Sequence, residues 1–248
     1  MIIEYHRPRN IEEVLTLLAR SQPETIPLGG GTYLSHFTDR PIAVVDLQSV
    51  GLNTIDREGD TYLRIGACVT LQKLCEHSDI SETLRCALFR ETTLNIRNVA
   101  TIAGTICAAN GRSPTALVLF AMDTALQFAD GLKIFIGDWL PLRKTSKQLI
   151  TSLTIPLDAL CYAEWISKTP QDLPIVGVAL TKWPSGRMRI TVGGSASQPL
   201  LLQDGKGSVN VDALSELAGK QYDAWNGQEY YPAVVKVLLQ RLLNQAGD

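Results

Sequence analysis

Residues 25–37 read TIPLGGGTYLSHF and place three consecutive glycines, Gly29, Gly30 and Gly31, between a strand-like run and a helix-like run. Glycine has no Cβ and adopts positive φ freely, so a glycine run can bring backbone N–H groups close to an anion such as a diphosphate. The run matches neither the GxGxxG pattern of dinucleotide-binding βαβ units nor the GxxxxGK[ST] pattern of P-loops. A phosphate cradle and a tight turn are both compatible with it.

A second stretch of small residues follows further along the chain. Residues 101–111 read TIAGTICAANG, which is rich in Ala, Gly and Thr and poor in large apolar side chains. The hydroxyls of Thr101 and Thr105, together with an unshielded backbone, could reach the same ligand as the glycine run. Two such segments predict a wrapped diphosphate, and the alternative is a tight packing contact between two elements.

Hydrophobic periodicity around these stretches predicts alternating helices and strands in the first part of the chain. Asn10 precedes an apolar helical face, and Glu13 three residues later completes a capping-box pattern. Caps, apolar spacing and β-branched runs predict helices over residues 10–20, 70–77, 81–93 and the start of 114–128, and strands over 41–47 and 61–67.

After residue 160 the pattern changes to an antiparallel meander. Residues 175–194 contain two strand-like runs joined at PSGR, which is typical of a hairpin, and two amphipathic helical runs close the chain. We therefore predict a boundary near residues 158–165, with one domain over residues 1–160 and a second over residues 161–248.

Composition and charge disfavour several classes of partner. The chain has 248 residues, 45% hydrophobic and 19% charged, which suffices for one large domain or two small ones. The formal net charge is −2 and the Lys and Arg residues are scattered, so we expect no binding to nucleic acid or to a membrane. The first residues do not resemble a signal peptide, and no run approaches ~18 apolar residues. We expect a soluble cytoplasmic protein.

Cysteine and histidine patterns give no sign of a metal site. The five cysteines are widely spaced, without a CxxC pair or a histidine at metal-ligand spacing, so buried reduced thiols are expected. His36 follows the glycine run and could touch a phosphate, whereas His6 and His77 have weaker claims; local hydrogen bonding is the alternative for all three. Arg97 could neutralise a diphosphate or pair with a carboxylate.

Four segments together resemble a known family. EYHRPRNIEEVLTLL, LGGGTYL, LRIGACVTLQKL and IRNVATIAGTICAANGRSPTALVLFAMDTAL occur in the order and spacing of the FAD-binding medium subunit of the xanthine dehydrogenase and carbon monoxide dehydrogenase family. The segments after residue 172 resemble the small last domain of that subunit, so the resemblance covers nearly the whole chain.

The resemblance implies an α+β fold. It consists of a two-lobed FAD-binding domain of the vanillyl-alcohol-oxidase (PCMH) type, with lobes of about 1–50 and 51–160, followed by a small α+β domain with an antiparallel sheet and helices. The implied cofactor is FAD. In such complexes this subunit works beside a [2Fe–2S] subunit and a molybdopterin-binding large subunit, and electrons pass through the clusters and the flavin to NAD or another acceptor.

The chain is thus expected to be the electron-transfer flavoprotein, an oxidoreductase component, of a molybdenum hydroxylase. Because the flavin itself does the redox work, no catalytic acid or base is expected. Carried over position by position, the expected cofactor-binding residues are Leu28, Gly29, Gly30, Gly31, Thr32, Tyr33 and Leu34 in a first loop and Thr101, Ile102, Ala103, Gly104 and Thr105 in a second loop.

Several residues depart from the family pattern. Tyr33 stands where a small polar or acidic residue is usual, Ala103 replaces a glycine and Thr105 replaces an asparagine. Pro114 stands where many relatives have aspartate, and Glu164 falls where a flavin-contacting lysine is common, so its carboxylate would disfavour an anionic reduced flavin.

The segment over residues 137–156 is also shorter than in most relatives. Two other functions are therefore kept open. The first is a non-catalytic scaffold subunit of the same complex that has lost FAD. The second is a stand-alone flavin oxidoreductase, which is disfavoured because no large substrate-capping domain follows residue 165.

Overall fold

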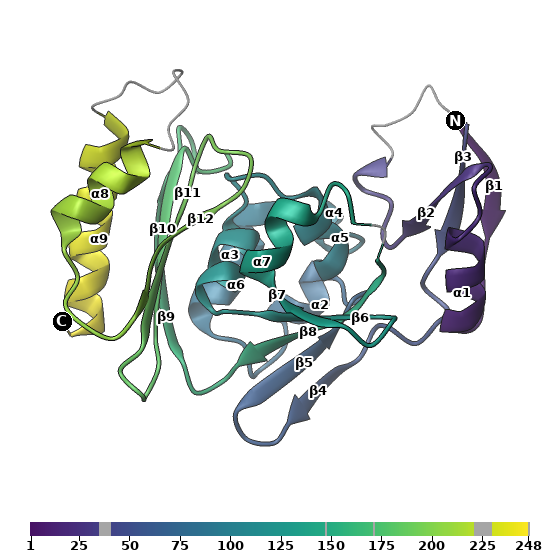
Figure 1. Cartoon of the computed structure of the whole chain (residues 1–248), viewed down its shortest axis with the longest axis horizontal. Coiled ribbons are helices and arrows are strands. Elements are labelled where there is room, and N and C mark those ends of the chain that lie inside the picture. Colours follow the sequence, from purple (N-terminus) through teal and green to yellow (C-terminus); the bar gives the residue numbers. More distant parts are fainter. Residues whose placement is uncertain (35–40, 147, 171, 221–229, 248) are drawn as a thin grey trace.

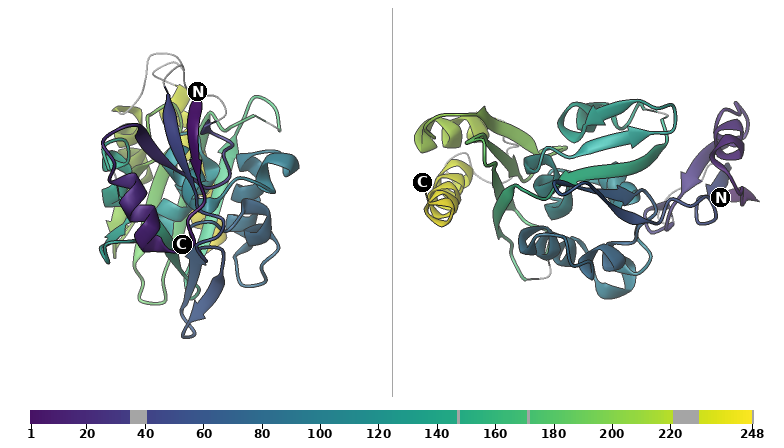
Figure 2. Two further views of the ribbon diagram at one scale, coloured as in Figure 1. Left: turned by 90° about the vertical axis from the view of Figure 1, so that its right-hand side faces the viewer. Right: turned by 90° about the horizontal axis from the view of Figure 1, so that it is seen from below.

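The computed structural model describes residues 1–34, 41–146, 148–170, 172–220 and 230–247, so His36 lies outside the described residues. Its three sheets follow one another along the long axis of the molecule, in the order of the sequence (Figure 1). The views in Figure 2 show the same order, with the C-terminal helices outermost at one end. No helix in the described ranges combines the length and the apolar character needed to cross a membrane.

The N-terminal sheet is small and parallel. Its strands are β1 (Ile2–His6), β2 (Glu24–Leu28) and β3 (Ile42–Asp46), in the order β1-β3-β2. Helix α1 (Ile11–Leu18) connects β1 to β2 and packs Val14 against Val45 of the central strand. Every residue of β3 is buried, which explains its unbroken run of apolar residues before Asp46.

The predicted cap of α1 is confirmed, with one change in its partners. The side chain of Asn10 accepts a hydrogen bond from the backbone N–H of Glu13 (2.8 Å). The Glu13 carboxylate accepts from the N–H of Arg9 (3.0 Å) instead of the N–H of Asn10.

The central sheet is antiparallel, in the order β4-β5-β8-β6-β7. Its strands are β4 (Ile55–Glu58), β5 (Tyr62–Gly66), β6 (Ala125–Phe128), β7 (Lys133–Phe135) and β8 (Ile150–Pro156). The accompanying helices are α2 (Leu71–Cys75), α3 (Glu82–Glu91), α4 (Leu94–Arg97), α5 (Ile102–Ala108), α6 (Pro114–Ala121) and α7 (Ile136–Trp139), with a 3₁₀ turn, η2, at Leu140–Leu142. Their apolar side chains and those of β5, β6 and β8 form the largest core of the protein.

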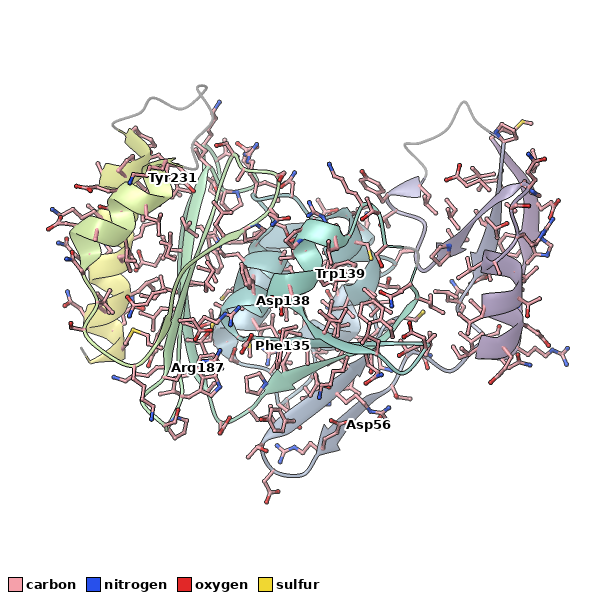
Figure 3. The ribbon with its side chains drawn as sticks, viewed as in Figure 1. Asp56, Phe135, Asp138, Trp139, Arg187 and Tyr231 are labelled. Atoms are coloured by element: carbon pink, nitrogen blue, oxygen red, sulfur yellow. The ribbon has the colours of Figure 1, made fainter. Side chains whose placement is uncertain are left out.

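The C-terminal sheet is an antiparallel meander, in the order β12-β11-β10-β9. Its strands are β9 (Leu160–Ile166), β10 (Val176–Lys182), β11 (Met188–Gly193) and β12 (Leu200–Gly205). Helices α8 (Val211–Lys220) and α9 (Tyr230–Ala246) cover its outer face, where Tyr231 of α9 points at the sheet and donates to the carbonyl of Gly193 (3.2 Å; Figure 3). The predicted hairpin over residues 175–194 is confirmed.

Strand β10 is covered on both faces, and its residues alternate in size accordingly. Val178 and Leu180 pack with α8 and α9. Gly177 faces α6, where a Cβ would lie 2.9 Å from Cδ2 of Leu117. Every residue of α6 is buried. Small residues on one face of the sheet therefore make room for this all-apolar helix.

Ion pairs hold the C-terminal sheet against the end of α6. Arg189 Nη1 lies 2.8 Å from Asp123 and 2.7 Å from Asp204, and Arg187 contacts the same two carboxylates at 2.7 Å each. Figure 3 shows Arg187 at the lower end of the sheet, beside the central part of the molecule. Only 8% of the Arg189 side chain is exposed, so this cluster is shielded more than a surface ion pair.

The glycine loop, residues 28–34, lies directly against the segment between α4 and α5. A Cβ on Gly30 would lie 1.9 Å from the carbonyl oxygen of Val99, and one on Gly29 would lie 2.6 Å from Oγ1 of Thr101. Gly31 has a φ of 71°, where side chains are disfavoured. Two of the three glycines are therefore required by the protein's own packing, which is the alternative that the sequence left open.

We expect Gly30→Ala to lower the free energy of unfolding by about 1–3 kcal/mol, because backbone must move to admit the methyl group. Gly31→Asn is the matched control. Its Cβ meets only a side-chain carbon of Leu28 at 3.3 Å, and Asn tolerates positive φ, so it should cost about 1 kcal/mol or less. Urea denaturation of flavin-free protein measures both. Equal stabilities of the two variants would contradict the contact.

The ion-pair cluster gives a prediction about acid stability. Hydrogen bonds from Arg187 hold the pKa of Asp204 below its usual value. The stabilisation is therefore complete above the unfolded pKa of about 3.9 and is lost as the pH falls through the lower folded pKa. Asp204→Asn should cost about 1–3 kcal/mol at pH 7 and should lose less further stability than wild type on acidification.

The exposed Asp212, which pairs with Lys236, provides the control. Asp212→Asn should change the free energy of unfolding by about 1 kcal/mol or less. Urea denaturation at several pH values between 7 and 3 measures both variants, and identical acid profiles of Asp204→Asn and wild type would refute the prediction.

Candidate functional site

Two adjoining cavities lie between the glycine loop and α5. The larger, of about 470 Å³, extends toward the end of α3. The smaller, of about 190 Å³, follows the loop itself. Thr32, Tyr33, Gly104 and Ala108 line both cavities, so together they form one groove.

The glycine loop lines the smaller cavity, and its glycine amides have no partner within the described residues. Among the residues that the structure describes, none accepts a hydrogen bond from the N–H of Gly29, Gly30 or Gly31. The amides at the start of α5 are already used, because Ile102 donates to the carbonyl of Val69 (2.9 Å). The loop therefore offers the donors, and α5 offers a surface of small side chains.

The residues expected to form a second loop instead begin a helix. Thr101 caps α5, with Oγ1 accepting from the N–H of Gly104 (3.2 Å), and the hydroxyl of Thr105 donates to the carbonyl of Thr101 (2.9 Å). Thr101, Gly104 and Thr105 line the groove. Ile102 and Ala103 pack in the core, so their side chains face away from the groove. The core position of Ala103 explains why a methyl group is tolerated there.

The residues expected in the first loop lie together. Leu28 ends β2 and is absent from the lining of both cavities. The others line the smaller cavity: Gly29, Gly30, Gly31, Thr32, Tyr33 and Leu34.

The histidines that the structure describes have local partners. His6 Nε2 lies 2.8 Å from a carboxylate oxygen of Glu4, and the ring of His77 accepts from the N–H of Asp79 (3.3 Å). Neither lines the groove. Local hydrogen bonding, the alternative given for them, therefore describes both.

Arg97 takes neither of its expected roles. Its guanidinium donates to the carbonyls of Phe89 and Thr92 and to the side chain of Gln72, at 2.7–3.3 Å, and it lies over the ring of Phe89. It therefore fixes the turn between α3 and α4. The signal that suggested a phosphate contact was only its position in the sequence.

Glu164, which falls where the family has a flavin-contacting lysine, does not line the groove. Its neighbour on β10 is Val178, on the face covered by α9, and its carboxylate binds Arg241 (3.5 Å) and Gln245 (3.1 Å) of that helix. The resemblance gave only the position of Glu164 in the sequence, which does not fix the face of a strand, because a shift of one residue reverses that face. Pro114 is the first residue of α6, a position that suits its fixed φ.

Sequence reasoning missed Glu91, which lines the larger cavity together with Ser113 and Asn110. The Glu91 carboxylate accepts from the hydroxyl of Ser113 (2.8 Å and 3.0 Å to its two oxygens) and from the N–H of Thr115 (3.0 Å). Burial raises its pKa. A signal was present, because an acidic residue at the last position of a helix opposes the helix dipole.

The C-terminal part of the chain closes one side of the groove. Gly111 donates to the carbonyl of Ala196 (3.0 Å) and accepts from the N–H of Gly194 (2.7 Å). Arg143, in the shortened segment, donates to the carbonyls of Ala109 (2.9 Å) and Ser197 (2.7 Å). These contacts join the end of α5 to the loop between β11 and β12, so the segment over residues 137–156 supports the edge of the groove.

Residues 1–158 match the family described as the FAD binding domain in molybdopterin dehydrogenase. The whole chain is 34% identical to the uncharacterized protein YgfM of Escherichia coli (strain K12), over 100% of this chain and 99% of that protein. It is 33% identical to the xanthine dehydrogenase FAD-binding subunit of Escherichia coli O157:H7, over 45% of this chain and 42% of that subunit.

The fold is also shared with solved structures. A chain of carbon monoxide dehydrogenase from Hydrogenophaga pseudoflava superposes with a TM-score of 0.82 at 18% sequence identity, over 98% of this chain and 96% of that chain. The mixed helix-and-sheet fold and the antiparallel sheets therefore agree with expectation. FAD, the expected cofactor, is the one for which the family is described, and its members include oxidoreductase subunits. This chain belongs to the family of FAD-binding domains of molybdopterin dehydrogenases.

Proposed function

We propose that this chain binds FAD in the groove and acts as the electron-transfer flavoprotein of a molybdenum hydroxylase. The observation that carries the proposal is the glycine loop, where the amides of Gly29, Gly30 and Gly31 have no acceptor within the described residues. Successive backbone N–H groups in a turn form a concavity suited to a diphosphate. Membership of the family supports FAD as the ligand.

The residues present fit such a cofactor. We assign the diphosphate to the glycine loop and the ring system to the larger cavity, whose volume of about 470 Å³ suits a small-molecule site. When bound, FAD supplies a redox centre that takes up and releases electrons. The chain's own residues orient the cofactor, and Tyr33, Gly104 and Ala108 form the walls shared by the two cavities. None of these walls needs a proton-transferring side chain.

We infer that the N-terminal and central sheets correspond to the two lobes of a PCMH-type domain, about 1–50 and 51–160. The change from the central sheet to the C-terminal sheet falls between β8 and β9, which supports a boundary near residue 160 and a second domain over residues 161–248. The groove lies between elements of the two proposed lobes, as a clamp around an extended cofactor requires.

For partners, we propose a [2Fe–2S] subunit and a molybdopterin-binding large subunit, with NAD or another acceptor receiving the electrons, in the cytoplasm. Two similarities support these partners. One relative is a FAD-binding subunit of xanthine dehydrogenase, and the fold is shared with a chain of carbon monoxide dehydrogenase.

One observation favours a second function, a scaffold subunit without FAD. Within the described residues, the lining of the groove contains no lysine or arginine, and Glu91 is its one acidic residue. A diphosphate would therefore be held by backbone N–H groups and neutral hydroxyls, without a cationic side chain. The flavin content of the purified protein separates this function from the first.

We expect Ala108→Trp to weaken FAD binding by about tenfold or more, equivalent to about 1.4 kcal/mol, because the indole would stand where the two cavities meet. Ala213→Trp, at an exposed position of α8, is the matched control. Flavin fluorescence titration and visible absorbance per chain measure both. Full flavin content in Ala108→Trp would place the cofactor elsewhere, and wild-type protein that binds no FAD would support the scaffold function.

The isolated chain should not oxidise purines, aldehydes or carbon monoxide, because it is proposed only to relay electrons. Co-expression with adjacent open reading frames should yield a complex that contains iron and molybdopterin, measured by metal analysis and by pterin release. Robust turnover of such a substrate by the isolated chain would overturn the subunit assignment and favour a stand-alone oxidoreductase.

A further inference from the structure

Glu91 is an unusual group in this groove because, among the residues that the structure describes, its hydrogen-bond partners are all neutral. Its carboxylate receives hydrogen bonds from the hydroxyl of Ser113 and the N–H of Thr115. It ends α3, where the helix dipole disfavours a negative charge, and it meets the start of α6, where the dipole favours one, so burial is what raises its pKa. It also lines the larger cavity, so it faces the space that we assign to the flavin ring system.

The nearby cations are engaged elsewhere. Arg90 lies over the ring of Trp165 (5.5 Å), and Arg97 binds the carbonyls of Phe89 and Thr92. Arg112, one residue before Ser113, donates to the carbonyls of Leu173 (2.5 Å) and Pro174 (2.8 Å). None of these guanidiniums is paired with Glu91.

The other titratable groups of the surrounding elements are also accounted for. Helix α6 carries no charged residue. On α3, Arg85 pairs with Glu82. Lys73 donates to the carbonyl of Asn53, and Glu76 accepts from the side chain of Gln72. Burial raises the pKa values of the thiols of Cys75, Cys86 and Cys161. Glu164 pairs with Arg241, and Tyr33 lines the same cavity as Glu91.

The geometry of the hydrogen bonds distinguishes the two oxygens of Glu91. Oε2 accepts from the N–H of Thr115 (3.0 Å) and is the nearer oxygen to Ser113 Oγ (2.8 Å against 3.0 Å). The single hydroxyl proton of Ser113 can serve only one oxygen at a time. Oε2 therefore acts as the acceptor, and Oε1 is the oxygen able to carry a proton.

We propose that Glu91 is a neutral carboxylic acid that contacts the cofactor, donating a hydrogen bond from Oε1 to a carbonyl oxygen of the flavin ring system. This inference rests on the proposed function, since it needs FAD in the larger cavity. The flavin ring presents several acceptor atoms and one imide N–H at its polar edge, so a donor matches most of that edge. Burial of the carboxyl without a cation raises its pKa, which agrees with a neutral acid.

The protonated form of Glu91 is the form proposed to bind FAD, and this determines how FAD affinity depends on pH. FAD affinity should be highest below the folded pKa of Glu91 and should fall as the pH rises through it. Stability of the flavin-free protein should change in the same direction. Because the folded pKa is raised, the stability contribution is complete below the unfolded pKa of about 4.3 and is lost as the pH rises through the folded pKa.

The test compares wild type with Glu91→Gln, whose amide donates a hydrogen bond but does not titrate. Fluorescence titration with FAD from pH 4 to pH 9 should show wild-type affinity falling by up to about tenfold, the worth of one hydrogen bond, as the pH passes the raised folded pKa of Glu91. The affinity of Glu91→Gln should be independent of pH, and at pH 9 this variant should bind more tightly than wild type. Glu82→Gln, at an exposed position of the same helix, should follow wild type.

A second measurement uses the flavin-free protein. Urea denaturation should show that the difference in stability between wild type and Glu91→Gln changes, to the disadvantage of wild type, as the pH rises from 4 through the raised folded pKa of Glu91. If this change occurs but FAD affinity does not depend on pH in wild type, the acid only caps α6 and the proposed contact is refuted. Affinity that rises with pH would identify an ionised acceptor and would also refute it.

Failure of the proposed function gives a different result. In that case wild type would bind no FAD at any pH, and Glu91 would have no flavin to contact. Wild type that binds FAD, with Glu91→Gln keeping the wild-type pH profile, would leave the proposed function intact and would overturn this inference alone.

Discussion

The close approach of the glycine loop to the Val99–Thr101 segment is the contact on which the rest of the site depends. Gly30 lies against the carbonyl of Val99 with no space for a Cβ, and Gly29 lies against the side chain of Thr101. Thr101 also caps α5. One short segment therefore sets the distance between the loop and the helix, and with it the width of the groove. Among the described residues, none accepts a hydrogen bond from the glycine amides of the loop, so these amides remain available for a ligand.

The groove is almost free of charge, which has consequences for any anion bound there. Within the described residues its lining consists of glycine, alanine, threonine and other neutral side chains, apart from Glu91. Backbone dipoles in a partly enclosed site interact more strongly than they would in water. Neutral surroundings also raise the free energy of an ionised Glu91. The carboxyl group is therefore stable in this groove only when it holds its proton or accepts hydrogen bonds.

The C-terminal sheet shapes the site from a distance. Helix α6 lies buried between that sheet and the central core, and the small residues of β10 permit its close packing. The ion pairs of Arg189 with Asp123 and Asp204 join the sheet to the end of the helix. Because Ser113 and Thr115 at the start of α6 bind Glu91, the position of the helix also determines where that carboxyl lies in the groove.

The sequence alone determined most of the elements, the family resemblance and the stretches around the ligand site. Caps and periodicity are local, so Asn10, Thr70 and Ser81 marked helices that the structure confirms. Gly104 and the residues of the predicted first loop from Gly29 to Leu34 line the same cavity, and their contact with a cofactor stays a prediction. The sequence failed at residues 101–105, because a helix start built from small side chains has the composition of a loop.

Only the tertiary structure decided which atoms meet. Position 30 requires glycine because the carbonyl of Val99, nearly 70 positions away in the chain, leaves no space for a Cβ. No local pattern encodes such a contact. The face of β9 on which Glu164 lies depends on strand register. The position of Glu91 at the end of α3 is a local signal, but its partners Ser113 and Thr115 are known only once α6 is packed beside it. Long-range packing, which brings together groups that are distant in sequence, therefore determined the chemistry of the groove, whereas local propensity determined the elements that surround it.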